Sequence, residues 1–257
     1  MNDKIVMTLA GALWYEFLMQ LRRKLVWIVF LLFAPTVFLL TYSPWTPWSE
    51  GLPVAHLVAN WSLVVQFFHP IAFGILLADR LPRDERTGVQ ELLDTLPAPL
   101  GARFLGKYVG ATLATLVPLV AIYPAGIVYI TASQGDVRAV PLGIATFLTI
   151  NLPGLLFVAA FSVSCPAVIW VPLYQFLFIG YWFWGNLIPA GFDIPTLTGT
   201  LLTPRGEYMA NGLFGTQQTT VRGTTLDAIA SMGLLLGLAA LALFATYCYL
   251  RWRQDHR

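Results

Sequence analysis

Apolar residues follow one another in long runs along most of this sequence, and polar residues gather in short segments between them. A helix needs about 20 mostly apolar residues to cross the hydrocarbon core of a bilayer. Six runs come near that length, and we predict a membrane-spanning helix in each of them: 25–41, 57–78, 108–132, 140–162, 166–186 and 226–250. The connection between the fourth and fifth spans is only a few residues long, so their boundary is the least defined.

The segments that flank these runs predict shorter helices. In residues 1–24, apolar side chains recur every fourth position from Ile5 to Phe17, and a basic run follows. This pattern predicts an amphipathic helix at the membrane interface, with an extension of the first span as the alternative. Residues 187–225 are too few and too apolar for a soluble domain, so we expect short helices at the outer leaflet. Residues 251–257 form a terminal tail.

The composition agrees with a membrane protein. Hydrophobic residues make up 57% of the 257 positions and charged residues only 11%, whereas soluble domains carry about 25% charged residues. A chain with so little charge cannot cover a water-facing surface, so its outer surface must meet lipid. We therefore predict an all-α integral membrane protein that forms a single transmembrane domain. The two cysteines lie in apolar runs and do not indicate a disulfide framework.

The basic residues orient the spans. Cytoplasmic loops carry an excess of Lys and Arg, and an N-terminus inside places 12 of the 15 basic residues on that side. The remaining three are Arg138, Arg205 and Arg222. We therefore expect a multi-pass protein of the plasma membrane, with both termini in the cytoplasm.

The loop between the second and third spans, residues 79–107, is the most polar part of the chain. It holds ten of the 28 charged residues, so it faces water or a polar partner. Thr87 and Gln90 have the spacing of a capping box. Four apolar residues after Thr87 would form one face of a short helix: Val89, Leu92, Leu93 and Leu96. Such a helix suits docking in another protein's groove, or lying on lipid headgroups. Glu91 and Asp94 on its polar face disfavour anionic lipid.

This loop resembles that of the type-2 ABC exporter permeases. The resemblance lies in the charged run Arg83-Asp84-Glu85-Arg86, in Gly88, in Glu91-Leu92-Leu93, in Pro97 and in Gly106-Lys107. The six-span layout and the N-terminal helix with Glu16 are also similar to that family. Pro82 before the charged run departs from the pattern and puts the start of the loop helix in doubt.

The resemblance implies a transport subunit rather than an enzyme. Such a permease pairs with a second permease subunit and with two cytosolic ATP-binding cassette subunits, which hold ATP and Mg²⁺. This chain would then need no cofactor or metal, and the loop would act as a coupling helix. The implied contact positions are Arg83, Asp84, Glu85, Arg86, Gly88 and Glu91, with Val89, Leu92 and Leu93 on the apolar face. The substrate is not implied.

Other functions find less support in the sequence. Residues 101–107 match the start of a phosphate-binding loop, but Tyr108 stands where the magnesium-binding Ser or Thr is required. A nucleophile elbow, which an intramembrane hydrolase of the α/β class would need, is also missing from the sequence. The second hypothesis is therefore a non-transporting membrane anchor or assembly subunit of a larger complex.

Polar residues inside the spans most simply predict hydrogen bonds between helices. We expect these for Asn151, Gln175 and Asn186, and we expect His69 to be neutral and bonded to a neighbouring helix rather than to line a pathway.

Two expectations concern other positions. Gly233-x-x-x-Gly237 is a better candidate for close helix packing than Gly106-x-x-x-Gly110. The acids in or near the outer segment, Asp193, Glu207 and Asp227, are expected to be solvated.

Overall fold

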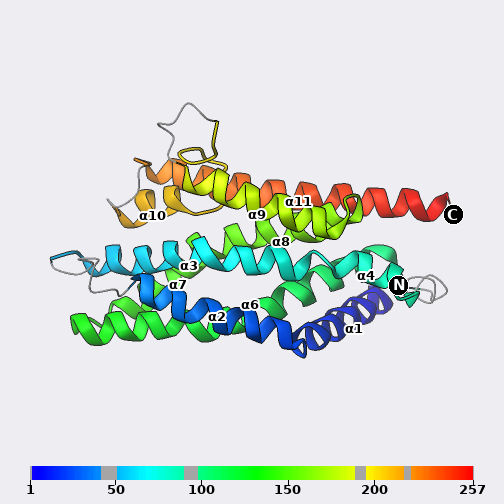
Figure 1. The fold of residues 1–257 in the computed structure, drawn as a ribbon, viewed down its shortest axis with the longest axis horizontal. Coiled ribbons are helices and arrows are strands. Elements are labelled where there is room, and N and C mark those ends of the chain that lie inside the picture. Colours follow the sequence, from blue (N-terminus) through cyan, green and yellow to red (C-terminus); the bar gives the residue numbers. More distant parts are fainter. Residues whose placement is uncertain (1, 42–50, 90–97, 189–194, 217–220, 257) are drawn as a thin grey trace.

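The computed structural model describes residues 2–41, 51–89, 98–188, 195–216 and 221–256. Within these residues the chain is helical and contains no strand, which confirms the all-α prediction. The α-helices are α1 Asn2–Leu21, α2 Lys24–Thr41, α3 Val54–Leu77, α4 Arg80–Arg86, α6 Leu100–Gln134, α7 Ala139–Thr146, α8 Leu152–Ser164, α9 Val171–Leu187, α10 Glu207–Phe214 and α11 Thr225–Asp255. The long helices lie side by side along one axis, with both termini and α4 at one end and α10 at the other (Figure 1).

Four of the described helices are long and apolar enough to cross a membrane. They are Val54–Arg86, Leu100–Gln134, Ala139–Ala167 and Thr225–Asp255. They contain the predicted second, third, fourth and sixth spans, and most extend several residues beyond the predicted bounds. The two other predicted spans correspond to α2, with 18 residues, and α9, with 17 residues. At a rise of about 1.5 Å per residue, each of these is close to the thickness of a bilayer core.

The boundary between the fourth and fifth predicted spans lies later than the sequence indicated. The α8 helix continues to Ser164, and a turn of 3₁₀ helix follows at Cys165–Ala167. The α9 helix then begins at Val171, with Pro172 in its first turn. Proline is favoured there because its missing N–H has no helical acceptor at that position. Pro172 thus starts a helix, whereas the sequence analysis placed it inside a span.

Pro153 changes the geometry of the fourth span. A proline inside a helix removes one hydrogen bond and crowds the carbonyl four residues earlier. The helix widens into a π-helical turn at Phe147–Asn151 immediately before α8, whose first turn contains Pro153. The span therefore stays continuous from α7 to α8 without a break.

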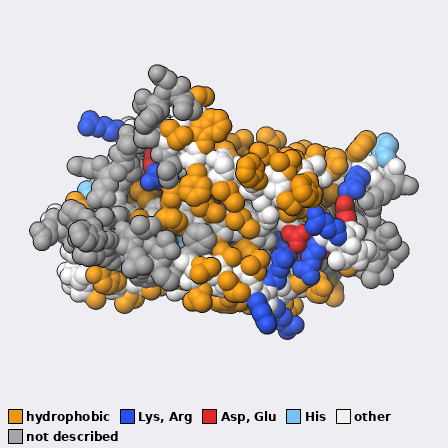
Figure 2. All heavy atoms as spheres, viewed as in Figure 1, with side chains coloured by type: hydrophobic (Ala, Val, Ile, Leu, Met, Phe, Trp, Pro, Cys, Tyr) orange, Lys and Arg blue, Asp and Glu red, His pale blue; other side chains and the backbone are white. Residues whose placement is uncertain are grey.

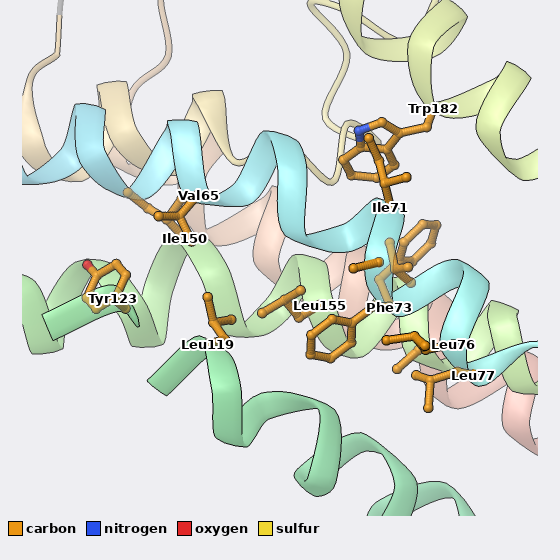
Figure 3. Close-up of a cluster of buried hydrophobic side chains, with 14 of the residues drawn as sticks. Val65, Ile71, Phe73, Leu76, Leu77, Leu119, Tyr123, Ile150, Leu155 and Trp182 are labelled. Carbon is orange, nitrogen blue, oxygen red and sulfur yellow. The ribbon is translucent and has the colours of Figure 1, made fainter. Parts of the chain in front are cut away.

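The α3 helix lies at the centre of the bundle, and most of its side chains are buried. Figure 3 shows Val65, Phe73 and Leu76 of α3 beside Leu119 of α6 and Leu155 of α8. Helix α9 lies against α3 through Trp182, whose indole N–H donates to the Phe67 carbonyl at 2.8 Å. The core thus surrounds one helix, and the other helices expose apolar side chains on their outer sides.

Buried polar side chains join the helices, as predicted for two of three positions. The Asn151 amide donates to the Ser62 carbonyl at 2.9 Å, and the Gln175 amide donates to the Ile75 carbonyl at 3.1 Å. Asn186 instead donates to Trp182 in its own helix, at 2.9 Å. His69 also bonds within its own helix, through Nδ1 and the Val65 carbonyl at 3.0 Å, so the predicted bond to a neighbouring helix is wrong.

The sequence favoured Gly233 and Gly237 over Gly106 and Gly110 as a site of close helix packing, and the structure shows the reverse. A Cβ on Gly106 would lie 2.7 Å from the Ala12 Cβ, and a Cβ on Gly110 would lie 2.4 Å from the Leu13 carbonyl oxygen. Helix α1 therefore packs directly on this stripe of α6. Gly233 and Gly237 face open space, with no atom within 4 Å of an added Cβ. Among the described residues, their motif packs against no other helix.

The expectation that the acids beyond α9 are solvated is wrong for Glu207. This side chain is buried and pairs with Arg205 at 2.9 Å. Burial raises the pKa of Glu207, and the positive charge of Arg205 acts in the opposite direction. Asp227 is in the first turn of α11 and caps the helix through Thr224, while Asp193 lies outside the described residues. The ion pair was missed because Arg205 precedes α10 and Glu207 begins it, so no helical spacing relates the two residues.

We predict that Gly110→Ala destabilises the protein and that Gly233→Ala does not. The methyl group at position 110 would meet the backbone of α1, which cannot rotate away, and overpacking of this kind costs about 1–3 kcal/mol. The methyl group at position 233 meets no atom and raises helix propensity. Thermal unfolding of both variants in detergent, followed by circular dichroism, measures the difference. Equal midpoints for the two variants would contradict the close packing of α1 on α6.

Candidate functional site

The charged side chains gather at the end of the bundle that carries both termini. Figure 2 shows Lys and Arg beside Asp and Glu at this end, while hydrophobic side chains cover the middle of the molecule. The charges come from the end of α1, from α4, from the start of α6 and from the end of α11. This end also contains the start of the 79–107 loop, so it is the candidate site.

Helix α4 gives the first part of the loop a fixed shape. It begins at Arg80, directly after the end of α3, and holds Pro82 in its first turn, where proline is tolerated. It ends at Thr87, whose hydroxyl donates to the Arg83 carbonyl at 2.9 Å. Gly88 follows with a φ of 70°, a left-handed conformation that commonly terminates helices. The charged run is therefore itself helical.

The predicted capping box at Thr87 takes a different form. The sequence placed Thr87 at the start of a helix, with Gln90 as its partner. In the structure Thr87 is the residue that ends α4. Its hydroxyl bonds backward to the Arg83 carbonyl, which also accepts the Thr87 backbone N–H at 3.0 Å. Gln90 lies outside the described residues.

Four charged side chains form a buried group beneath α4. The Lys107 ammonium pairs with Asp84 and lies 3.8 Å from Glu16 Oε1. The Arg80 guanidinium lies 3.9 Å from Glu16 Oε2 and has no exposed surface. The Glu16, Asp84 and Lys107 side chains are 7%, 12% and 11% exposed. We call Glu16, Arg80, Asp84 and Lys107 the buried quartet; its two cations and two anions balance.

The charge of Glu16 depends on this balance. Burial raises the pKa of Glu16, and the charges of Lys107 and Arg80 act in the opposite direction. A carboxylate removed from water is costly unless it is paired. The two cations therefore keep α1 attached to α4 and α6 by opposing that cost.

A second layer of ion pairs surrounds the quartet. Asp79 lies 3.6 Å from Arg23 and 3.7 Å from Arg86. Glu85 pairs with Arg253 near the end of α11. Isolated pairs at a surface contribute little, typically 0–1 kcal/mol each. Their consequence here is geometric, because together with the quartet they connect α4 to α1, α6, α11 and the α1–α2 junction.

A pocket of about 100 Å³ opens beside α4. Asp84, Lys107 and Arg103 line it on one side, and Pro166 and Arg253 line it on the other. It lies between α4, α6, α11 and the turn that follows α8. Its size suits a few water molecules or an inserted side chain rather than a transported substrate.

The structure separates the residues predicted as contact positions. Asp84 is buried in the quartet, and Arg83 is half-buried. Glu85, Arg86, Gly88 and Val89 are exposed. Glu91 and Leu92 lie outside the described residues. The exposed members form a continuous surface at the C-terminal end of α4, whereas Asp84 faces the bundle.

Sequence analysis missed the residues that hold this surface in place. Lys107 and Glu16 had been noted only as parts of the resemblance, and Arg253 only as a basic residue of the tail. One signal was present: Glu16 is the single acid within a long apolar stretch. The glycine stripe of α6 carries Lys107 on the turn between Gly106 and Gly110, which places that cation beside α1.

Residues 101–107, which match the start of a phosphate-binding loop, belong to a helix. Helix α6 begins at Leu100, so these residues do not form a loop that could wrap around a phosphate. Lys107, which would contact the phosphate in such a motif, is held by Asp84 and Glu16. This geometry supports the view that the motif is coincidental.

The chain matches no protein-family model and no curated protein sequence. The functional argument therefore depends on the resemblance of residues 83–107 and on the geometry of the charged end.

We predict that Lys107→Met destabilises the protein strongly, whereas Arg138→Met has little effect. Breaking a buried ion pair leaves an uncompensated charge and costs about 3–5 kcal/mol. Arg138 pairs with Asp136 at 2.8 Å, but its side chain is 84% exposed, so water screens that pair and its loss should change stability little. Unfolding in detergent, followed by tryptophan fluorescence, measures both.

The double variant Asp84→Asn/Lys107→Met provides the control. It removes one cation and one anion and leaves the Glu16–Arg80 pair intact, so it should recover much of the loss. Equal destabilisation by the single and the double variant would show that Lys107 acts by packing and not by charge.

Proposed function

We propose that this chain is the membrane permease subunit of an ATP-driven exporter of the type-2 ABC class. The observation that supports it best is the attachment of α4. This helix carries the start of the loop that resembles the coupling loop of that class, and ion pairs connect it to α1, α6 and α11. A force on the loop would therefore reach several helices at once.

The proposed mechanism uses the two faces of α4. Its exposed surface, with Glu85, Arg86, Gly88 and Val89, contacts a cytosolic ATP-binding cassette subunit, together with Glu91 and Leu92 further along the loop. Its buried side, with Asp84, transmits the displacement to Lys107 of α6. Closure of the ATPase subunits then changes the exposure of a path between two permease copies. ATP and Mg²⁺ bind to the partner, and this chain contributes no catalytic residue.

The proposal includes an arrangement in the membrane. Helices α2 and α9 complete six spans, α1 lies at the cytoplasmic interface, and the segment with α10 lies at the outer leaflet. Both termini and α4 are at the same end of the bundle (Figure 1). Most basic residues belong to that end, which supports its placement in the cytoplasm of a plasma-membrane protein.

We predict opposite accessibility for the two ends of the bundle. In a background without Cys165 and Cys248, Val137→Cys and Arg251→Cys place single thiols at exposed positions. A membrane-impermeant maleimide should label position 137 in intact cells and position 251 only after permeabilisation. The reverse pattern would contradict the orientation. Labelling of both positions in intact cells would contradict the odd number of spans proposed between position 137 and position 251.

We also predict that Val89→Asp uncouples the partner ATPase. Val89 is 40% exposed beside the end of α4, and a carboxylate buried in a contact there should lower the stimulation of ATP turnover about tenfold, which corresponds to 1.4 kcal/mol. Val137→Asp, at the other end of the bundle, is the matched control. Purified permease is reconstituted with the ATP-binding cassette protein that co-purifies with it, and turnover is measured.

Glu91→Arg should have the same effect as Val89→Asp, without preventing membrane insertion. Unchanged turnover in both loop variants would refute the coupling function. If other membrane subunits co-purify in place of an ATP-binding cassette protein, the chain is an anchor or assembly subunit.

A further inference from the structure

The junction between α1 and α2 carries an unusual concentration of positive charge. Helix α1 ends at Leu21 and α2 begins at Lys24, so Arg22, Arg23 and Lys24 form the turn between them. Arg83 of α4 lies near enough for its charge to act on Arg23, and Asp79 connects Arg23 to Arg86. We call Arg22, Arg23, Lys24, Arg83 and Arg86 the basic elbow.

The neighbouring acids do not neutralise this group. The buried quartet beneath it contains two cations and two anions and is balanced. Asp79 is the carboxylate that the structure pairs with the basic elbow, through Arg23 at 3.6 Å and Arg86 at 3.7 Å. Among the described residues, five cations against one paired carboxylate leave an excess of four positive charges around the α1–α2 junction.

The N-terminus of α2 lies at the basic elbow, and its partial charge is unfavourable for basic side chains. The N-terminus of a helix carries a partial positive charge, which favours anions and disfavours cations. Helix α2 has no acidic residue in its first turn and begins with Lys24. An anion held at this point would interact favourably with the helix terminus and with the basic side chains.

A buried guanidinium lies close enough to the basic elbow for the charges of the elbow to act on it. Arg80 has no exposed surface, and none of its side-chain nitrogens makes a hydrogen bond among the described residues. Its one ion pair, with Glu16, is 3.9 Å long. The charges of Arg23 and Arg83 both act against it. A negative charge between those two arginines would therefore relieve repulsion that reaches into the core of the site.

The surface beside the basic elbow is apolar and aromatic. Trp14 and Tyr15 of α1 are 59% and 67% exposed, and Trp27 and Ile28 of α2 are 46% and 51% exposed. The Trp27 indole N–H is bonded to the Leu21 carbonyl at 2.9 Å, which fixes this ring at the elbow. Tryptophan and tyrosine favour the level of the lipid headgroups. A ligand at the elbow thus meets cations at one end and an apolar surface at the other.

We infer that the basic elbow binds the headgroup phosphate of an anionic phospholipid. The phosphate lies against Arg22, Arg23, Lys24 and Arg83 at the start of α2, and the acyl chains run along the exposed apolar surface of α1 and α2. The basic elbow shares Arg86 with the exposed end of α4, but the residues placed against the phosphate lie outside that surface, and the inference does not depend on the transport proposal. The bound lipid would hold the α1–α2 junction, and through Asp79 it would stabilise α4.

The test compares lipid retention by the purified full-length protein. The protein is exchanged into micelles that contain equal amounts of phosphatidylglycerol and phosphatidylcholine, and bound lipids are counted by native mass spectrometry. The wild type should retain phosphatidylglycerol in preference. Arg22→Gln/Lys24→Gln should weaken that preference about 25-fold, because each basic residue near an anionic headgroup contributes about fivefold.

Arg222→Gln/Arg251→Gln is the matched control, since it removes the same charge from exposed positions elsewhere. It should leave the preference unchanged. An equal loss in the control would overturn the inference, because binding would then reflect net charge alone. Equal retention of the two lipids by the wild type would also overturn it, whatever the variants do.

Two further outcomes separate other ligands. Displacement of the lipid by millimolar inorganic phosphate would show that the elbow binds free phosphate and would overturn the lipid assignment. Loss of a co-purifying protein from the elbow variant, with lipid retention unchanged, would assign the elbow to a protein partner instead. Circular dichroism of each variant verifies that the helices are intact.

Discussion

The pairing of Lys107 is the interaction on which the charged end of this protein depends. Lys107 stands at the start of a helix that enters the apolar bundle, where an unpaired ammonium would be costly. Asp84 and Glu16 supply the compensating charge, and they come from α4 and α1. One cation thus fixes the position of two other helices, and the surface presented by α4 follows from that position.

Close backbone contact makes this pairing possible. Gly106 and Gly110 stand on either side of Lys107 along α6, and α1 lies directly on them. Without side chains at these two positions the helices approach closely enough for Glu16 to reach the ammonium. Small residues perform this function in membrane proteins because packing, and not the hydrophobic effect, brings helices together in lipid. The glycine stripe and the buried quartet are therefore one structural unit.

The sequence predicted the helices better than it predicted their contacts. Long apolar runs identify spans because a bilayer demands a minimum length, so α3, α6 and α11 were all found. The bounds of α3 are within three residues of the prediction, whereas α6 begins eight residues earlier and α11 ends five residues later than predicted. Contacts depend on which faces meet, and periodicity does not carry that information. Gly233 and Gly237 match the motif as well as Gly106 and Gly110 do, yet among the described residues it is Gly106 and Gly110 that pack against another helix. The charge of the 79–107 loop indicated a polar surrounding, and the resemblance implied the contact positions. Neither showed that Asp84 would be buried while Glu85 is exposed.

The two faces of α4 determine how a displacement of the loop would be transmitted to the rest of the bundle. A helix of seven residues is too short to be stable alone in water. Its shape is maintained by the quartet on one side and by the pairs of Asp79 and Glu85 on the other. A contact that moves α4 must therefore carry Lys107 and Glu16 with it or separate buried charges, and separation is the more costly course. Movement of α4 together with α1 and α6 is for that reason the least costly response to a force on the loop.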